Sequence, residues 1–233
     1  ELALAGVDVA FVERRASQDL VGSRAGGLHS RTIEVLDQRG VAERFLSQGQ
    51  VHNVVHFHVP LDISDFPTRH NYVLGLWQNH IERILAEWIG ELGVPIHRAR
   101  EVTGFTQDDA GVDVELSDGQ HLRSEYLVGC GGGRSLIRKT DGIEFPGWDA
   151  TVSWLIAEVE FSEEPAWGFR HDGVGTHGIG KVEEAGRARV VLTERQVGPA
   201  SEPTLRDVSE AMIGIYGTDY GIHSPTWISR FND

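Results

Sequence analysis

The sequence has 233 residues, enough for one large or two small domains with a real hydrophobic core. With 21 basic and 35 acidic residues its net charge is −14, which repels phosphate backbones, so nucleic acid is not an expected partner. No apolar run approaches the roughly 18 residues of a membrane span, so no membrane association is expected. Cys130 is the single cysteine, which excludes an internal disulfide and a thiolate zinc cluster, and we expect a reducing, cytoplasmic location.

The first half of the chain combines short apolar strands with amphipathic helices. Apolar runs predict strands at residues 7–13, 51–59 and 72–77. Helical spacing predicts a helix that ends before Gly6, a helix at 29–47 with a break at Gly40, and a helix at 79–92. Residues 15–28 are rich in glycine and polar side chains and are expected to form a loop.

The second half is predicted to contain mainly antiparallel strands. A three-stranded meander is expected at 101–107, 112–117 and 121–129. The last part of it, residues 126–128, leads as a strand into the glycine-rich turn 129–133 and a helix at 134–139. Beyond residue 150 the pattern predicts strands at 151–162, 173–181 and 187–194, a linker at 198–203, a helix from Thr204 to Tyr216 and a strand at 227–229.

Three segments combine residue types that suit a nucleotide cofactor. Glu13 ends a predicted strand, and in a dinucleotide-binding fold such a carboxylate accepts hydrogen bonds from the adenosine ribose. Residues 129–134 lie between a strand and a helix, where N–H groups can face an anion, although an arginine at the sixth position departs from G-x-G-x-x-G. Arg24 stands beside two glycines, a combination that suits phosphate. Each feature alone is also compatible with a solvated side chain or a tight turn.

Other motifs that carry chemistry are not found in the sequence. His52, His56 and His58 lie close together, but no nearby carboxylate or cysteine completes a ligand set, so no metal site is predicted. The sequence contains no G-x-S-x-G, H-E-x-x-H or P-loop motif, which leaves hydrolase and nucleoside-triphosphatase functions without support. No catalytic residue is assigned.

Five segments carry motifs in a recognisable order. They are VERR at 12–15; SRAGGLHSRT from residue 23, with EV at 34–35 and QRG at 38–40; residues 78–93 from Gln78; YLVGC from residue 126 with RS at 134–135 and RK at 138–139; and YGTDYGIHSP from residue 216 with Trp227. Together they resemble the FAD-dependent aromatic hydroxylases, or class A flavoprotein monooxygenases. They are most similar to the branch that acts on aromatic polyketides and rifamycin-type antibiotics, and the fifth segment resembles the rifampicin monooxygenases.

The resemblance, which covers nearly the whole chain, implies a set of cofactor-binding residues. Glu13 would bind the adenosine ribose, with Arg14 beside it, and Arg24 would contact FAD near its pyrophosphate or mobile ring. Gln78, expected just before its helix, would also hydrogen-bond FAD. The turn at Gly131 and Gly132 would serve both FAD and NADPH, although the family usually has Asp-Gly there.

The same resemblance implies an α/β fold. A partial glutathione-reductase-like FAD-binding domain, residues 1–50 and 79–150, would be interleaved with a β-rich (α+β) substrate-binding domain, residues 51–78 and 151–233. The first strand with its G-x-G-x-x-G turn, and a later Gly-Asp motif for FAD, would lie outside the chain. Since the chain also begins without methionine, we expect an internal fragment of a longer enzyme that is inactive when isolated.

The function implied is an FAD-dependent monooxygenase that uses NADPH or NADH and molecular oxygen. Its substrate would be a bulky aromatic natural product such as a rifamycin-type antibiotic or an aromatic polyketide. One alternative is a non-catalytic fragment or aromatic-binding remnant that no longer holds flavin, which Gly131 favours. Another is a different flavoprotein of the same fold, such as a reductase or an isoprenoid epoxidase. The sequence gives no indication of oligomeric state.

Overall fold

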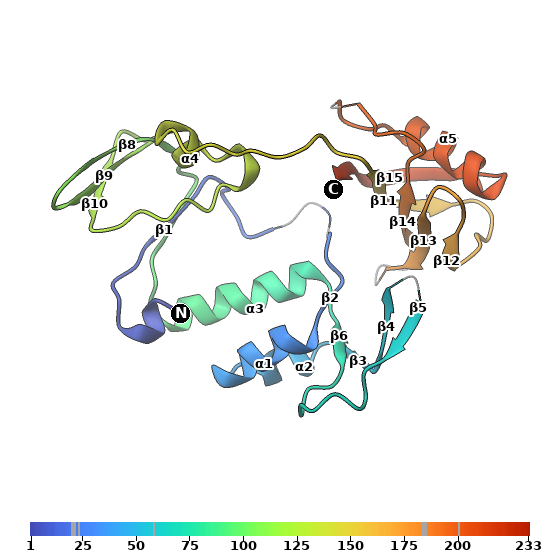
Figure 1. The fold of residues 1–233 in the computed structure, drawn as a ribbon, viewed down its shortest axis with the longest axis horizontal. Coiled ribbons are helices and arrows are strands. Elements are labelled where there is room, and N and C mark those ends of the chain that lie inside the picture. The colour runs from blue at the N-terminus through green and yellow to red at the C-terminus, as the bar shows by residue number, and fades with distance from the viewer. Residues whose placement is uncertain (20–21, 23, 58, 183–185, 200) are drawn as a thin grey trace. The chain divides into compact units, whose positions relative to one another are not determined.

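The computed structural model describes residues 1–19, 22, 24–57, 59–182, 186–199 and 201–233. Contacts divide the chain into two compact units, which we call unit 1 (Glu1–Pro146) and unit 2 (Gly147–Asp233). Figure 1 traces both, and each has a hydrophobic core made from its own residues. The boundary after Pro146 lies close to the change of pattern predicted near residue 150. Residues 51–78 belong to unit 1 by these contacts, and their grouping with residues 151–233 in a substrate domain stays a prediction.

Helices and a small sheet form the main core of unit 1. The helices are α1 (Ser30–Gln38), α2 (Ala42–Leu46) and α3 (Gln78–Glu91), and the sheet has the order β2 (Gly27–Leu28), β6 (Val73–Gly75), β3 (Gln50–His52). Ile33, Phe45, Leu74 and Ile84 are fully buried between them. The predicted break at Gly40 is confirmed, because α1 and α2 are separate helices and Gly40 has a left-handed φ of 71°.

Residues 50–62 of unit 1 form more strands than the predicted single one. Besides β3, the strands β4 (Val54–Phe57) and β5 (Val59–Asp62) pair antiparallel as a hairpin. β6 then returns to pair with both β2 and β3. β2 was not predicted, because two residues beside glycines carry no strand periodicity.

The outer strands of unit 1 confirm the predicted meander. β8 (Val102–Asp108), β9 (Gly111–Leu116) and β10 (His121–Ser124) are antiparallel neighbours in the order β10-β9-β8. β1 (Phe11–Glu13) pairs in parallel with β7 (Ile96–Arg98). β7 was not predicted, because its three residues are mostly polar and carry no apolar alternation.

The strand predicted at 126–128 is wrong. Residues 126–128 form no strand, and among the described residues no other strand pairs with them. Tyr126 and Val128 are 84% and 70% exposed. Because a strand exists only through its inter-strand hydrogen bonds, an apolar run without a paired neighbour stays extended but irregular. The short helices nearby are η1 (Ala3–Ala5) at the start of the chain, and η2 (Gly132–Arg134) and α4 (Leu136–Thr140) after the glycine turn.

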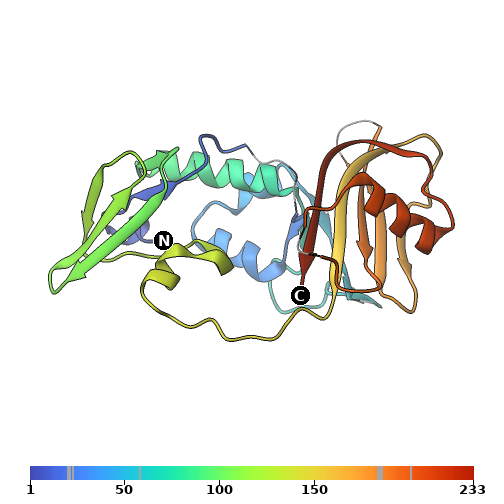
Figure 2. The ribbon, with the colours of Figure 1, turned by 90° about the horizontal axis from the view of Figure 1, so that it is seen from above.

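Unit 2 is an antiparallel sheet with one helix. Its strands are β11 (Ser153–Phe161), β12 (Gly168–His171), β13 (Thr176–Lys181), β14 (Arg187–Thr193) and β15 (Ile222–Asn232), in the order β12-β13-β14-β11-β15. α5 (Leu205–Tyr216) lies along one face of this sheet, as Figure 2 shows. β12 was not predicted, because all four of its residues are exposed and lack a periodic apolar pattern.

The predicted helix of unit 2 begins and ends as its sequence indicates. Thr204 and Asp207 form a capping box, in which each side chain accepts a hydrogen bond from the other residue's backbone N–H. Gly217 ends the helix in a left-handed conformation with φ of 81°. Val208 and Met212 of α5 pack against Leu155, Val190 and other fully buried residues of the sheet.

A nearly buried ion pair between Arg230 and Glu194 lies at the β15 edge of the unit 2 sheet. Arg230 donates from Nε and Nη2 to the two carboxylate oxygens of Glu194 at 2.8 and 3.0 Å. Its Nη1 also donates to the carbonyl oxygens of Pro199 and Ser201 at 3.0 and 3.1 Å. Only 9% of the Arg230 side chain and 14% of the Glu194 side chain are exposed. The pair therefore fixes Pro199 and Ser201 to β15.

We expect Arg230→Met to lower the free energy of unfolding by about 3 kcal/mol, because the Glu194 carboxylate would stay buried without its partner. The matched control is Arg206→Met, which removes an arginine from an exposed pair with Glu210 whose side chains are 85% and 60% exposed. That change should cost less than about 1 kcal/mol. Urea unfolding of the three proteins measures both effects, and equal losses in the two variants would contradict the assignment.

Candidate cofactor site

The carboxylate of Glu13 lies at the carboxyl end of β1 and is held by the loop that follows. Its Oε1 accepts a hydrogen bond from the Arg15 N–H at 2.9 Å, and the Arg15 Nε lies 3.5 Å from the same oxygen. The backbone hydrogen bond and the charges of Arg15 and Arg98 hold the pKa of Glu13 below its ordinary value. Glu13 is therefore an ionised acceptor at the end of a parallel strand, the arrangement that a ribose diol requires.

Gln78 joins the start of α3 to the loop that carries Arg24. Its Oε1 accepts hydrogen bonds from the N–H groups of Arg24 and Ala25 at 3.1 and 3.3 Å. The Gln78 N–H donates in turn to the Ala25 carbonyl oxygen at 3.1 Å. These three bonds hold the backbone of Arg24 beside the positive end of a 14-residue helix, while Arg24 itself is exposed. An exposed guanidinium at this place suits an anionic ligand.

Glu82 connects the two parts of the site. Gln78 Nε2 donates to Glu82 Oε1 at 2.7 Å, and Arg15 Nη2 lies 3.9 Å from Glu82 Oε2. A continuous series of contacts therefore runs from Glu13 through Arg15, Glu82 and Gln78 to the backbone of Arg24. Neither Arg15 nor Glu82 was predicted as a site residue. The signal for Glu82 was its position four residues after Gln78, which places both side chains on one helix face.

The two glycines beside Arg24 have a packing role. A Cβ at Gly27 would lie 2.6 Å from the carbonyl oxygen of Leu74, and one at Gly26 would lie 3.1 Å from the Trp77 ring. The Gly26 carbonyl oxygen accepts a hydrogen bond from the Leu76 N–H at 3.1 Å. Glycine is thus required because the loop backbone lies close to β6 and the residues after it. The prediction was that the backbone at these glycines approaches a phosphate.

The remaining predicted residues are Arg14, Gly131 and Gly132. Arg14 is exposed next to Glu13. Gly131 precedes η2, and Gly132 has a left-handed φ of 66° that favours glycine. Among the described residues, no hydrogen bond or ion pair joins Gly131 or Gly132 to Glu13, Arg24 or Gln78. Their role in cofactor binding stays a prediction.

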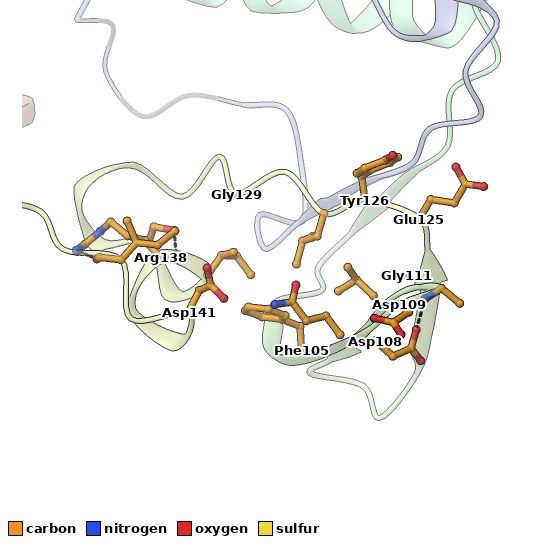
Figure 3. Close-up of a pocket in the computed structure, with 16 residues that line it drawn as sticks. Phe105, Asp108, Asp109, Gly111, Glu125, Tyr126, Gly129, Arg138 and Asp141 are labelled. Atoms are coloured by element: carbon orange, nitrogen blue, oxygen red, sulfur yellow. Dashed lines mark hydrogen bonds between the residues drawn. The ribbon is translucent and has the colours of Figure 1, made fainter.

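A separate cavity of about 810 Å³ lies between the meander and the α4 region. Figure 3 shows Phe105 and Asp108 on the meander side, with Arg138 and Asp141 opposite them. None of the six residues predicted to bind a cofactor lines this cavity. Since Arg138 donates to the carbonyl oxygens of Gly133 and Ile143 at 3.2 and 3.3 Å, its guanidinium mainly fixes the glycine-rich turn.

The histidine cluster lies only partly within the described residues. His58 and Ser23 lie outside the described residues. Within the described ranges, no group of three or more histidine, cysteine, aspartate or glutamate side chains is placed to hold a metal ion. Over the same ranges, no helix is long and apolar enough to cross a membrane.

Comparison with known proteins identifies the family. The FAD-binding domain family matches residues 1–233, and the chain belongs to that family. Rifampicin monooxygenase from Streptomyces venezuelae is 39% identical over the whole chain, which covers 51% of that relative's length. The 12-dehydrotetracycline 5-monooxygenase/anhydrotetracycline 6-monooxygenase of Streptomyces rimosus is 36% identical over the whole chain, which covers 50% of it. The chain thus spans about half the length of the curated relatives it matches.

Solved structures confirm the predicted α/β fold class. The anhydrotetracycline hydroxylase of Streptomyces rimosus superposes with a TM-score of 0.85 at 36% identity, covering 100% of this chain and 49% of that one. An aromatic hydroxylase from angucycline biosynthesis superposes with a TM-score of 0.87 at 30% identity, covering 100% and 48%. The resemblance to flavin-dependent aromatic hydroxylases is therefore confirmed.

The residues of unit 1 fit the cofactor that the family name implies. FAD carries a ribose diol and a pyrophosphate, which need an acceptor and a cationic environment respectively. Glu13 offers an ionised carboxylate, and Arg24 with the N-terminus of α3 offers positive charge. The contacts through Arg15 and Glu82 connect these two features in one network.

We expect Gln78→Ala to release the loop at Arg24, because two backbone N–H groups would lose their acceptor at about 1 kcal/mol each. Hydrogen exchange at the Arg24 and Ala25 amides should speed up about tenfold or more. Glu87→Ala is the matched control, since Glu87 lies on the same helix in an exposed pair with Arg83. Unchanged exchange at both amides in Gln78→Ala would show that the loop is held by other contacts.

Proposed function

We propose that the protein that carries this chain is an FAD- and NAD(P)H-dependent monooxygenase. It hydroxylates a bulky aromatic natural product, such as a rifamycin-type antibiotic or an aromatic polyketide, with molecular oxygen as co-substrate. FAD supplies the redox chemistry and the activation of oxygen, so the chain needs no nucleophile of its own. Its residues bind and orient the cofactor and the substrate.

The observation that carries the proposal is the Gln78–Arg24 contact in a chain whose relatives are monooxygenases of aromatic antibiotics. The loop and helix that hold Arg24 are joined by three hydrogen bonds, which fix the backbone that carries this cationic side chain in advance of binding. Relatives of 39% and 36% identity are a rifampicin monooxygenase and a tetracycline-pathway monooxygenase. Both names point to polycyclic aromatic substrates.

A second candidate function is catalysis or binding without hydroxylation. Dialkyldecalin synthase from Streptomyces rugosporus is 35% identical over 69% of this chain and 35% of its own length. A Diels–Alderase from pyrroindomycin biosynthesis shares the fold with a TM-score of 0.88 at 29% identity, covering 99% of this chain and 51% of that one. Gly131, at a position where the family usually has a carboxylate, favours this candidate.

The test is made on the full-length protein. Its visible absorbance spectrum reports bound flavin, and NADPH or NADH oxidation with and without rifampicin or anhydrotetracycline reports coupling to an aromatic substrate. The proposal expects bound flavin, substrate-stimulated oxidation of the nicotinamide and a product heavier by one oxygen atom. Bound flavin with no oxygenated product from any polycyclic aromatic would favour the second candidate.

Arg24→Ala should weaken FAD binding about tenfold to hundredfold, because a hydrogen bond to a charged group contributes roughly 1.5–3 kcal/mol. Titration of the apoprotein with FAD, followed by flavin fluorescence, measures the change. Arg31→Ala is the control, since Arg31 lies in the same sequence motif but only in an exposed pair with Glu34. A flavin content that survives gel filtration unchanged in Arg24→Ala would remove Arg24 from the site.

Gly131→Asp should tighten the use of FAD or NADPH by a factor of about ten or more, because it restores a charged acceptor. The Gly131 φ of −80° suits any residue, and a Cβ there would lie 3.2 Å from the Ser135 Cα, so only a small local shift is needed. Gly132→Ala, at a left-handed position, serves as a control for disturbance of the turn. If titration shows that Gly131→Asp binds neither FAD nor NADPH more tightly than the native protein does, the turn does not bind cofactor as it does in the family.

A further inference from the structure

The sheet of unit 2 has one face against α5, and among the described residues of this unit no helix packs on the other face. Leu155, Ala157 and Val159 of β11 pack in the core together with Val208 and Met212 of α5. Successive side chains of a strand point to opposite faces, so the intervening residues of β11 face away from α5. We call this opposite side of the sheet the helix-free face; Figure 2 shows α5 on the other side.

Strand register brings one row of residues together on the helix-free face. Gly180 of β13 pairs with Arg189 of β14, Arg189 pairs with Glu158 of β11, and Glu158 pairs with Trp227 of β15. Their neighbours confirm the orientation, since the residues before and after Arg189, and the residue after Trp227, pack on the core side. A row of this composition combines an acid, a base and an aromatic ring side by side.

The charged pair in the middle of this row is largely removed from solvent. Arg189 Nη2 donates to Glu158 Oε1, and the two side chains are 10% and 19% exposed. Taking two charges out of water is costly, and an apolar pair of similar size usually serves stability as well or better. Stability therefore does not explain the pair. A carboxylate and a guanidinium side by side can receive a phenol hydroxyl and donate to a neighbouring carbonyl oxygen.

Aromatic side chains lie on the same face as the pair, four residues away from Glu158 and Trp227 along β11 and β15. Trp154 and Phe231 stack with ring centroids 5.2 Å apart and an angle of 14° between their planes. A register shift in β15 lies between the partners of Glu158 and Glu160, and Ser224 within it has a left-handed φ of 48°. Bulges and strained non-glycine residues of this kind concentrate where a side chain is aimed at a ligand. At Gly180 a Cβ would meet nothing within 4 Å, which leaves room over the row.

We propose that Glu158 and Arg189 are the specificity-determining pair for the substrate. They select planar polycyclic rings in which a phenol hydroxyl adjoins a carbonyl group, while Trp154, Trp227 and Phe231 supply the surface on which the rings stack. The hydroxyl exchanges its internal hydrogen bond to the neighbouring carbonyl for one to the Glu158 carboxylate, and the carbonyl oxygen then accepts from the Arg189 guanidinium. This inference rests on the proposed function, because it names the substrate class of that reaction.

The test compares two ligands that differ only in their phenol groups, 1,8-dihydroxyanthraquinone and anthraquinone. Their affinities for the full-length protein are measured by quenching of tryptophan fluorescence, without nicotinamide, so that no turnover occurs. The native protein should bind the dihydroxy compound about tenfold or more tightly than anthraquinone. Glu158→Leu combined with Arg189→Met, an apolar replacement that should fold, is expected to reduce the preference to about twofold or less.

A neighbouring ion pair provides the matched control. Arg187 and Glu160 lie on the same two strands, with Arg187 Nη2 3.2 Å from Glu160 Oε1 and side chains 16% and 37% exposed. Glu160→Leu with Arg187→Met should retain the full preference for the dihydroxy compound. If the two double variants lose the preference equally, or if neither loses it, the assignment to Glu158 and Arg189 is overturned.

Two further variants separate selection from stacking and from loss of fold. Phe231→Ala should weaken both anthraquinones by a similar factor, because it removes stacking surface without touching the pair. If the apolar double variant does not fold, Glu158→Gln takes its place in the test, because it keeps the shape of the side chain. It should lose at least half of the preference for the dihydroxy compound. A full preference in a folded Glu158→Gln variant would count against the proposal.

The two proposals fail in different ways. Flavin absorbance and oxygenated product, measured on the same preparations, decide the monooxygenase function. A protein that binds the dihydroxy compound selectively through Glu158 but forms no oxygenated product contradicts only that function. A working monooxygenase whose selectivity ignores Glu158 contradicts only the specificity pair.

Discussion

Two backbone N–H groups, those of Arg24 and Ala25, share the side-chain oxygen of Gln78, and the geometry of the cofactor site depends on this contact. The β2–β6 ladder and the Leu76 N–H bond to the Gly26 carbonyl oxygen bring the end of the loop after β1 beside the start of α3, and Gln78 then fixes Arg24 and Ala25 at that point. Gln78, at the first position of the helix, supplies the acceptor, and its amide nitrogen donates a hydrogen bond to Glu82. The backbone of Arg24 is therefore positioned by neutral hydrogen bonds, and Arg24 is an exposed residue.

The other end of the site depends on parallel strand pairing. β1 and β7 are far apart in sequence, and their pairing places Glu13 opposite Arg98. Arg98 also donates to the carbonyl oxygen of Ser17 at 3.2 Å, so the strand partner helps to hold the loop that follows Glu13. The charge of Arg98 contributes to keeping Glu13 ionised. A short two-stranded ladder thus sets the position of Glu13 and helps to keep its carboxylate ionised.

Unit 2 uses charge in two distinct ways. The Glu194–Arg230 pair holds a loop through further hydrogen bonds to two carbonyl oxygens, so its guanidinium is fully used within the protein. The Glu158–Arg189 pair lies instead in the centre of a sheet face that carries stacked aromatic rings. Similar degrees of burial therefore accompany different surroundings in the two pairs.

The sequence by itself determined the elements whose signals are local. Residues a few positions apart predict the caps of α5, the break at Gly40 and the turns of the meander. The order of the motifs was enough to indicate the FAD-binding family. Only the tertiary structure decided what depends on distant partners. The segment 126–128 has strand-like residues but no paired neighbour, whereas β7 has a partner and little apolar pattern. The buried His70, between Asp37 at 3.0 Å and the Tyr72 hydroxyl at 2.8 Å, had no sequence signal, and the same holds for the pairing of Glu158 with Arg189. Hydrogen bonds and ion pairs between residues tens of positions apart form only when packing brings the elements together, so no local pattern records them.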